Sequence, residues 1–268
     1  LLSLGELLGR SIPPRKALLW PWLREGEACL LWAPTGAGKS LFALSVALAV
    51  AGGGEFLGWS AGDPGADRGP WRVLYVDGEM PLGDIQDRAR MLLGAVPGID
   101  RGRAGGGVQF LARLGQDGDG DGFPSVTDDQ GRRAILGLVE RGGVDLVILD
   151  NLSTLGDVDD ENNASDWNAL QATLLALKRA GVAVVVVHHA RKDGDTYRGS
   201  SKLGATMDVV LGLERNAQWS AGEARFTLRW EKVRASGKDL REITVGLATD
   251  ADGRAEWRAA GGGRLGAV

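Results

Sequence analysis

Short continuous apolar runs, each closed by polar residues, recur along the first two thirds of the chain. The segments that contain them are residues 29–33, 71–80, 108–114, 144–150 and 182–187. Strands that are apolar on both faces belong to parallel sheets, which helices cover on both sides. Helical spacing follows at residues 41–50, 81–93 and 159–179, and residues 125–141 are predicted to be a linker followed by a helix. The alternation predicts an α/β fold with a mostly parallel central sheet flanked by helices.

A different pattern follows the run at 182–187. Three strand-like segments, at residues 209–213, 225–233 and 240–247, follow one another with polar turns and no helix between them. Consecutive strands of this kind pair as antiparallel hairpins. We therefore expect an antiparallel C-terminal extension at one edge of the sheet.

The ends of the chain differ from this core. Residues 1–12 carry leucines at helical spacing, and Pro13-Pro14 ends the pattern. The apolar face of this helix either folds onto its own domain or packs on a neighbouring subunit. The predicted organisation is a helical segment over residues 1–14, a main domain over 15–260 and a Gly-rich tail over 261–268.

Composition limits the function classes. A net charge of −4 argues against a globally basic nucleic-acid coat but leaves room for a local basic strip. Cys29 is the single cysteine, so no intramolecular disulfide is possible, which fits a reducing cytosol. No run of 18 apolar residues is present, so we expect a cytoplasmic protein without a membrane span. The chain begins at Leu1 rather than Met, which is consistent with a fragment of a longer protein.

A phosphate-binding loop is the most specific motif. An apolar run leads into Ala33-Pro34-Thr35-Gly36-Ala37-Gly38-Lys39-Ser40, and Leu41 opens a helical pattern. Backbone N–H groups of such a loop surround phosphate, and a Lys in this position reaches the β/γ-phosphates. The hydroxyl of Ser40 is placed to ligate Mg²⁺. We therefore expect ATP and Mg²⁺ as cofactors, with residues 34–41 holding the nucleotide; the alternative is an ordinary Gly-rich turn before a helix.

Acidic residues close two of the predicted strands. Asp150 follows four apolar residues, the position of the second carboxylate that organises Mg²⁺, and the alternative is an Asp that caps a helix. Glu79 is the candidate base that orients the attacking water. Asp77 competes with it, because residues two apart in a strand point to the same face.

His188-His189 ends the next strand, and a polar group there lies beside the γ-phosphate. We favour His189 over His188; the alternative is a capped strand end. The loop at 190–202 that follows is polar and basic, with Arg191, Lys192, Arg198 and Lys202, either as a DNA-binding strip or as a solvated loop. The Asp-Gly repeat within residues 115–124 predicts a mobile loop and lacks the Glu that closes an EF-hand.

Together these residues resemble the RecA-like core of ring-shaped replicative helicases, the RepA type of plasmids and the related DnaB and phage primase-helicase types. The motifs that carry the resemblance are A-P-T-G-A-G-K-S at 33–40, V-D-G-E-M-P at 76–81, L-V-I-L-D-N at 146–151, H-H at 188–189, R-G-S-S at 198–201 and E-K-V-R at 231–234. They span roughly residues 15–260, nearly the whole chain. The sequence departs from the family in having Ala33 where the loop usually has Gly, and Asp rather than Lys or Arg in the loop at 115–124.

The resemblance implies roles for individual residues. It makes Glu79 the catalytic glutamate and His189 the γ-phosphate sensor. Arg88 would stack on the nucleotide base, and Lys232 and Arg234 would reach into the neighbouring subunit's site. A hexameric ring would then be required for activity.

The same resemblance implies partners. The loops at 115–124 and 190–202 would face a central channel and hold single-stranded DNA, the second through Lys192, Arg198 and Lys202; the Asp residues of the first loop argue against its contacting DNA. No primase or zinc domain is visible, so a separate primase or initiator would act with this protein.

Three functions compete. The first is an ATP-driven ring-shaped helicase translocating on single-stranded DNA in replication. The second is a RecA-like ATPase that does not unwind DNA and acts in recombination, loading or regulation. The third is a P-loop kinase acting on a small molecule, against which Lys232 and Arg234 argue.

Overall fold

The computed structural model describes residues 1–66, 69–115, 122–156, 164–191, 196–197, 201–215, 224–234, 240–249 and 254–260. The helices are α1 (Leu4–Leu8), α2 (Lys39–Gly52), α3 (Leu82–Ala95), α4 (Arg101–Gly107), α5 (Asp129–Gly142), α6 (Leu152–Leu155), α7 (Ala164–Arg179) and α8 (Ser201–Thr206). The strands are β1 (Ala17–Trp20), β2 (Leu23–Arg24), β3 (Ala28–Ala33), β4 (Glu55–Phe56), β5 (Trp59–Ala61), β6 (Val73–Asp77), β7 (Val108–Ala112), β8 (Leu146–Asp150), β9 (Ala183–His189), β10 (Val209–Glu214), β11 (Arg225–Val233), β12 (Ile243–Thr249) and β13 (Ala255–Ala259).

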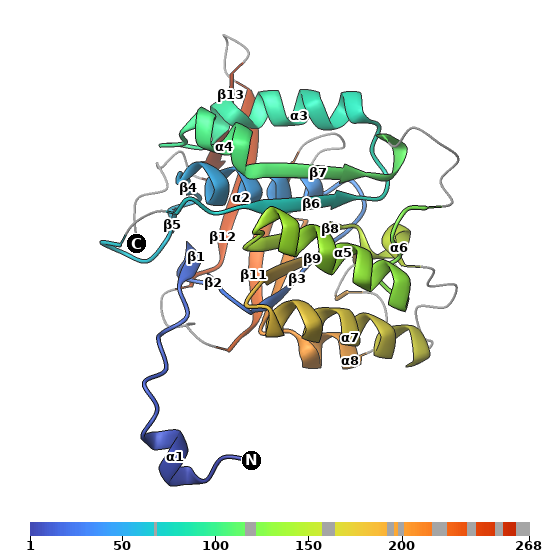
Figure 1. The fold of residues 1–268 in the computed structure, drawn as a ribbon. Helices are drawn as coiled ribbons and strands as arrows, with labels where there is room; N and C mark the ends of the chain where they lie inside the picture. Colours follow the sequence, from blue (N-terminus) through green and yellow to red (C-terminus); the bar gives the residue numbers. More distant parts are fainter. Residues whose placement is uncertain are drawn as a thin grey trace.

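The main sheet is mixed and runs β13-β12-β11-β10-β3-β9-β8-β6-β7 within the described residues (Figure 1). The strands from β10 to β7 in this order are parallel, and β11, β12 and β13 are antiparallel additions beside β10. The predicted α/β fold, with its parallel centre and antiparallel extension, is confirmed. The runs that form β3, β6, β8 and β9 are buried on both faces, whereas the edge strand β7 is partly exposed.

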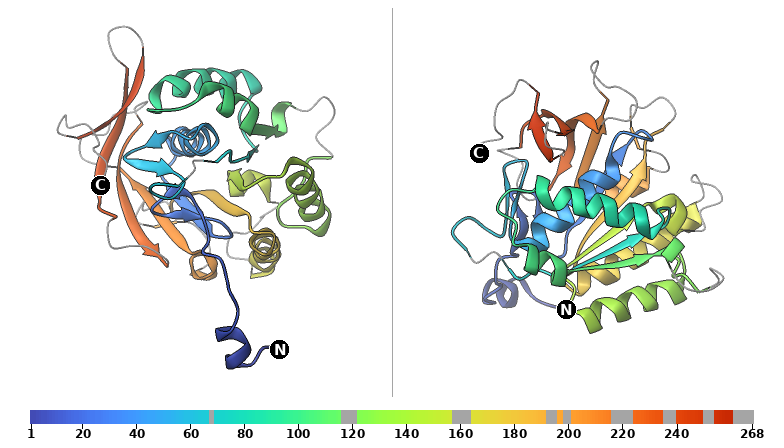
Figure 2. Two further views of the ribbon diagram at one scale, coloured as in Figure 1. Left: turned by 60° about the vertical axis from the view of Figure 1, so that its left-hand side comes forward. Right: turned by 90° about the horizontal axis from the view of Figure 1, so that it is seen from above.

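Two hydrophobic clusters lie on opposite faces of this sheet. Alternate residues of β6 divide between them: Val73 and Tyr75 join α2, α3 and α4, whereas Leu74 and Val76 join α5, α7 and α8. Figure 2 shows α2 enclosed between the sheet and the pair α3 and α4. This explains why α2 is apolar around its whole circumference.

Several features differ from the sequence prediction. A second sheet, of order β2-β1-β5-β4, was not predicted; β1 and β2 precede β3, and β4 and β5 lie between α2 and β6. The predicted helix over residues 1–12 is confined to α1, none of whose residues is buried. α1 lies at the end of an extended segment that leaves the body of the molecule (Figures 1 and 2).

The C-terminal strands also differ in extent. The strand expected at 240–247 is β12 at Ile243–Thr249, and β13, which was not predicted, forms the edge of the sheet. The Gly-rich tail and residues 116–121 of the Asp-Gly loop lie outside the described part of the chain.

Candidate functional site

The loop between β3 and α2 has the geometry that phosphate binding requires. Gly36 and Gly38 have φ values of +79° and +103°, which side chains with a Cβ rarely adopt. A Cβ on Gly38 would also lie 2.8 Å from Cβ of Ala224, which precedes β11. Gly38 is followed directly by α2, whose first N–H groups have no helical partners and face the loop end. The backbone can therefore surround a phosphate group.

Lys39 stands at the junction of loop and helix. Its side chain is mostly buried, and Nζ lies 3.4 Å from the carbonyl oxygen of Ala33 and 3.3 Å from that of Pro34. Its Nζ also lies 3.3 Å from Nδ1 of His189. Oγ1 of Thr35 lies 3.4 Å from the same nitrogen. The end of β9 thus meets the phosphate loop directly, because Ala33 and His189 are neighbours in adjacent parallel strands.

Asp150 is the buried carboxylate of the site. The Tyr75 hydroxyl donates a hydrogen bond of 2.6 Å to Oδ2 of Asp150. Burial raises the pKa of Asp150, while hydrogen bonds from Tyr75 and Ser40 and the charge of Lys39 act to lower it. A carboxylate beside a serine hydroxyl is an oxygen donor set of the kind that Mg²⁺ prefers. Ser40 and Asp150 are therefore the residues that would hold a Mg²⁺ ion, which would supply positive charge beside the nucleotide phosphates.

Asp77 and Glu79 do not share one face of a strand, contrary to the sequence prediction. β6 ends at Asp77, which pairs in register with Asp150, and the chain then bends. Oδ1 of Asp77 accepts the N–H groups of Glu79, at 2.9 Å, and Met80, at 2.6 Å. Asp77 is buried, which raises its pKa to about 6, whereas Glu79 is exposed. Asp77 thus holds the turn that presents Glu79 to solvent.

This arrangement leads to a prediction that separates the two carboxylates. Glu79→Gln should bind Mg-ATP and assemble normally while losing turnover by about 10²-fold or more, the scale of a lost general base. Asp77→Asn keeps an acceptor oxygen for the turn and should retain more activity than Glu79→Gln. Steady-state hydrolysis with nucleotide-binding titrations on both variants measures this. Loss of turnover in Asp77→Asn alone would reverse the assignment.

Two arginines lie near the carboxyl ends of the strands. Arg88, predicted to stack on the base, is half-buried on α3. Burial raises the pKa of Tyr75, and the charge of Arg88 opposes that rise only weakly, so Arg88 lies on the Tyr75 and Asp150 side of the sheet. Arg215 was missed by the sequence analysis. Its guanidinium donates a 2.6 Å hydrogen bond to the carbonyl oxygen of Thr35. The sequence feature that could have identified Arg215 is its position directly after β10, which lies parallel to and beside β3.

Lys232 and Arg234 lie at the other end of the sheet. β11 runs antiparallel to β10, so Val233 pairs with Val209, the first residue of β10. Arg234 follows, and its Nη1 is 3.2 Å from Oδ1 of Asp208. These two cations therefore lie far along the strands from the phosphate loop of their own chain.

Asp208 is a buried carboxylate at the amino ends of the parallel strands, and it contacts several groups there. It accepts the N–H of Ala28 at 3.0 Å and contacts the ammonium of Lys178 at 2.5 Å. Hydrogen bonds from Lys178 and Ala28, with the charge of Arg234, outweigh burial and lower its pKa. The predicted DNA-binding residues Lys192 and Arg198, and the side chain of Lys202, lie outside the described residues.

The parallel sheet with its antiparallel extension, the glycine-containing phosphate loop and the carboxylates at the strand ends define a RecA-like P-loop ATPase. The family model AAA_25, described as an AAA domain, matches residues 2–195, and the chain belongs to this family.

Among solved structures, a KaiC-like protein from the hyperthermophilic archaeon Pyrococcus horikoshii OT3 is similar, with a TM-score of 0.56 and 16% identity over 90% of this chain and 93% of that chain. At this identity the likeness concerns the fold alone. No curated protein matches the chain. Among the described residues, none of the helices combines the length and apolarity needed to cross a membrane.

Proposed function

We propose that this protein is an ATP-driven, ring-shaped DNA helicase that translocates on single-stranded DNA in replication. The observation that carries the proposal is the separation of the catalytic groups along the sheet. Lys39, Glu79 and Asp150 lie at the carboxyl ends of the parallel strands, whereas Arg234 lies at their amino ends. Arg234 can therefore reach a γ-phosphate only if that phosphate is bound by a second subunit.

Within one subunit, different residues bind the phosphates, activate the water and contact the segment after β9. The phosphate loop and Lys39 hold the β- and γ-phosphates, and Mg²⁺ at Ser40 and Asp150 would neutralise charge on them. Glu79 orients and deprotonates the attacking water. His189 contacts the phosphate loop and begins the segment that leads to the basic residues, so it can report the nucleotide state to that segment.

Between subunits, Arg234 supplies a cation to the neighbouring site. Its side chain is 57% exposed although Asp208 holds it, so it is available to a partner. The resemblance assigns Lys232 to the same task. Six subunits in a ring would place single-stranded DNA against residues 190–202, and a separate primase or initiator would supply priming.

The test of the DNA contact is a triple variant. Replacing Lys192, Arg198 and Lys202 together by Ala should remove the stimulation of hydrolysis by single-stranded DNA and spare basal hydrolysis. The physical reason is that an acidic protein binds DNA through a local cation strip, whose contacts release counterions and are salt-dependent. Hydrolysis is measured over a DNA titration at two salt concentrations.

Lys16, an exposed lysine before β1, provides the control when changed to Ala together with Arg10 and Arg15, two further exposed cations. Unchanged DNA affinity in the first triple variant would place the DNA site elsewhere. The outcome that favours a non-unwinding RecA-like ATPase is DNA-stimulated hydrolysis without strand separation.

A further inference from the structure

We propose that Lys232 anchors α8 and, through Tyr197, the described residues of the segment between β9 and α8. The Nζ atom of Lys232 donates to the carbonyl oxygens of Gly204, at 2.9 Å, and Ala205, at 3.1 Å. Both carbonyl groups belong to the last turn of α8, where no helical N–H is left to bond them. A cation at the C-terminal end of a helix is also favoured by the helix dipole.

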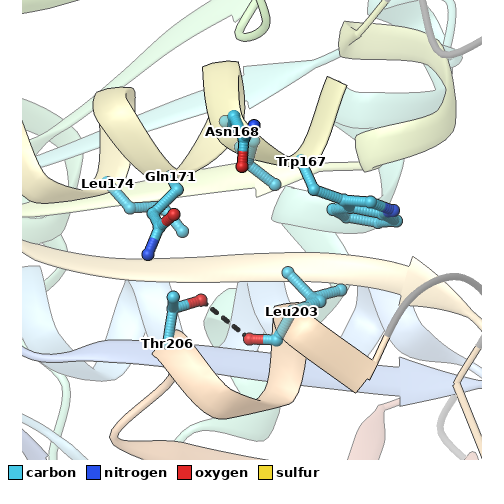
Figure 3. Close-up of a pocket in the computed structure, with 7 residues that line it drawn as sticks. Trp167, Asn168, Gln171, Leu174, Leu203 and Thr206 are labelled. Carbon is cyan, nitrogen blue, oxygen red and sulfur yellow. Dashed lines mark hydrogen bonds between the residues drawn. The ribbon is translucent and has the colours of Figure 1, made fainter. Parts of the chain in front are cut away.

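α8 depends on outside contacts for its position. It has six residues, too few for a helix to be stable by itself in water. Leu203 and the following Met207 are buried in the cluster on this face of the sheet. The packing against α7 is incomplete, because a shallow cleft remains between the two helices. The labelled residues that line it are Trp167, Asn168, Gln171, Leu174, Leu203 and Thr206 (Figure 3).

The same helix contacts the segment that leads out of the nucleotide site. Tyr197 lies against Gly204 so closely that a Cβ there would come within 2.2 Å of its hydroxyl oxygen. Tyr197 also bridges to Ala190, and the N–H of Arg191 donates to the carbonyl of Thr196 at 2.8 Å. The described residues of this segment are thus tied at one side to α8 and at the other to the residue after His189.

The contacts give the two cations of the E-K-V-R motif different roles. In this arrangement the ammonium of Lys232 contacts two carbonyl groups of its own chain, whereas the side chain of Arg234 is more than half exposed although its guanidinium contacts Asp208. Lys232 is then a positioning residue within its own subunit, in place of the finger role that the resemblance implies for it, and Arg234 alone is the cation available to the neighbour. The link to DNA rests on the proposed function; the anchoring of α8 does not.

Hydrogen exchange of the full-length chain, without DNA or nucleotide, tests the anchor. Lys232→Met removes the donor and keeps the aliphatic stem. It should speed amide exchange over residues 196–207 on the order of tenfold, the effect of losing two modest hydrogen bonds. Lys232→Arg keeps a donor and should restore most of the protection. Arg229→Met is the matched control, because Arg229 lies on the same strand and pairs with Glu214, 2.6 Å away, instead of α8.

Wild-type exchange in Lys232→Met, or no recovery in Lys232→Arg, would overturn the anchor. Should Lys232→Met not fold, Tyr197→Phe is the second variant. It removes the hydroxyl beside Gly204 and should raise exchange over α8 in the same direction; unchanged exchange there overturns the link between α8 and the segment.

The consequence for DNA has a separate readout. In Tyr197→Phe, the concentration of single-stranded DNA that gives half-maximal stimulation of hydrolysis should rise roughly threefold or more, since the hydrogen bond between the Tyr197 hydroxyl and the backbone of Gly204 is lost. The maximal rate should change much less. If DNA does not change the hydrolysis rate of the wild-type protein, the proposed function is wrong. The exchange experiment would still show whether Lys232 anchors α8. An unchanged half-maximal concentration alongside raised exchange would overturn the link to DNA.

Discussion

Lys39→Ala is expected to abolish ATP hydrolysis and to weaken nucleotide binding. The buried ammonium is fixed at the end of the phosphate loop by the carbonyl groups of Ala33 and Pro34 and lies beside His189. It is therefore already placed where charge grows on the transferred phosphoryl group. Loss of such a preorganised cation costs on the order of 10³-fold or more in rate.

The measurement is steady-state hydrolysis with and without DNA, together with a nucleotide titration. Lys16→Ala is the control, because Lys16 is exposed and precedes β1 rather than α2. A rate equal to that of the wild type in Lys39→Ala would remove the basis for every role assigned to this site.

Arg234→Ala is expected to lose about 10³-fold in hydrolysis although its own phosphate loop is intact. The scale is that of a finger cation supplied in trans. Arg234 lies beyond the end of β11, at the amino ends of the parallel strands, so its effect should fall on a neighbouring subunit. Glu79→Gln should be nearly inactive for a different reason, the loss of the base in its own site.

Mixing these two variants distinguishes a role of Arg234 in the neighbouring active site from a structural role in its own subunit. In a mixed ring some interfaces receive Glu79 from one subunit and Arg234 from its neighbour, and activity should partly return. The alternative role for Arg234 is structural. The alternative from the sequence is a solvated cation face near the edge of the sheet. Residues 229, 230, 232 and 233 of β11 pair with β10 and, among the described strands, not with β12, and Arg234 forms an ion pair with Asp208. Normal DNA-stimulated hydrolysis by Arg234→Ala alone would leave only this structural role.

The fold was largely predictable because its strands carry a strong local signal. β6, β8 and β9 are buried on both faces, so their apolar runs are continuous and each ends at a polar residue of the site. The phosphate loop was predictable because its glycines and Lys39 follow one another in sequence. The short strands β4 and β5 contain two and three residues and give no comparable pattern.

The parts of the site that were missed depend on contacts between distant segments. Arg215 reaches Thr35 only because β10 lies beside β3. The order of strands in the sheet cannot be read from local sequence patterns. Asp208 joins Ala28 across 180 residues for the same reason. Asp77 was expected to point with Glu79, but its carboxylate bonds the following backbone and turns the chain. An Asp side chain that bonds the N–H groups of the next residues favours a turn over continuation of the strand, so residues 77 and 79 no longer share a face.

Strand separation is the most direct test of the proposed helicase. A forked DNA with a single-stranded tail is incubated with the wild-type protein and Mg-ATP, with a non-hydrolysable analogue, or with Glu79→Gln and Mg-ATP, and released strand is measured. The proposal predicts release by the wild type with Mg-ATP only. Hydrolysis that DNA stimulates, without release of the strand, would contradict it and identify a RecA-like ATPase that does not unwind DNA.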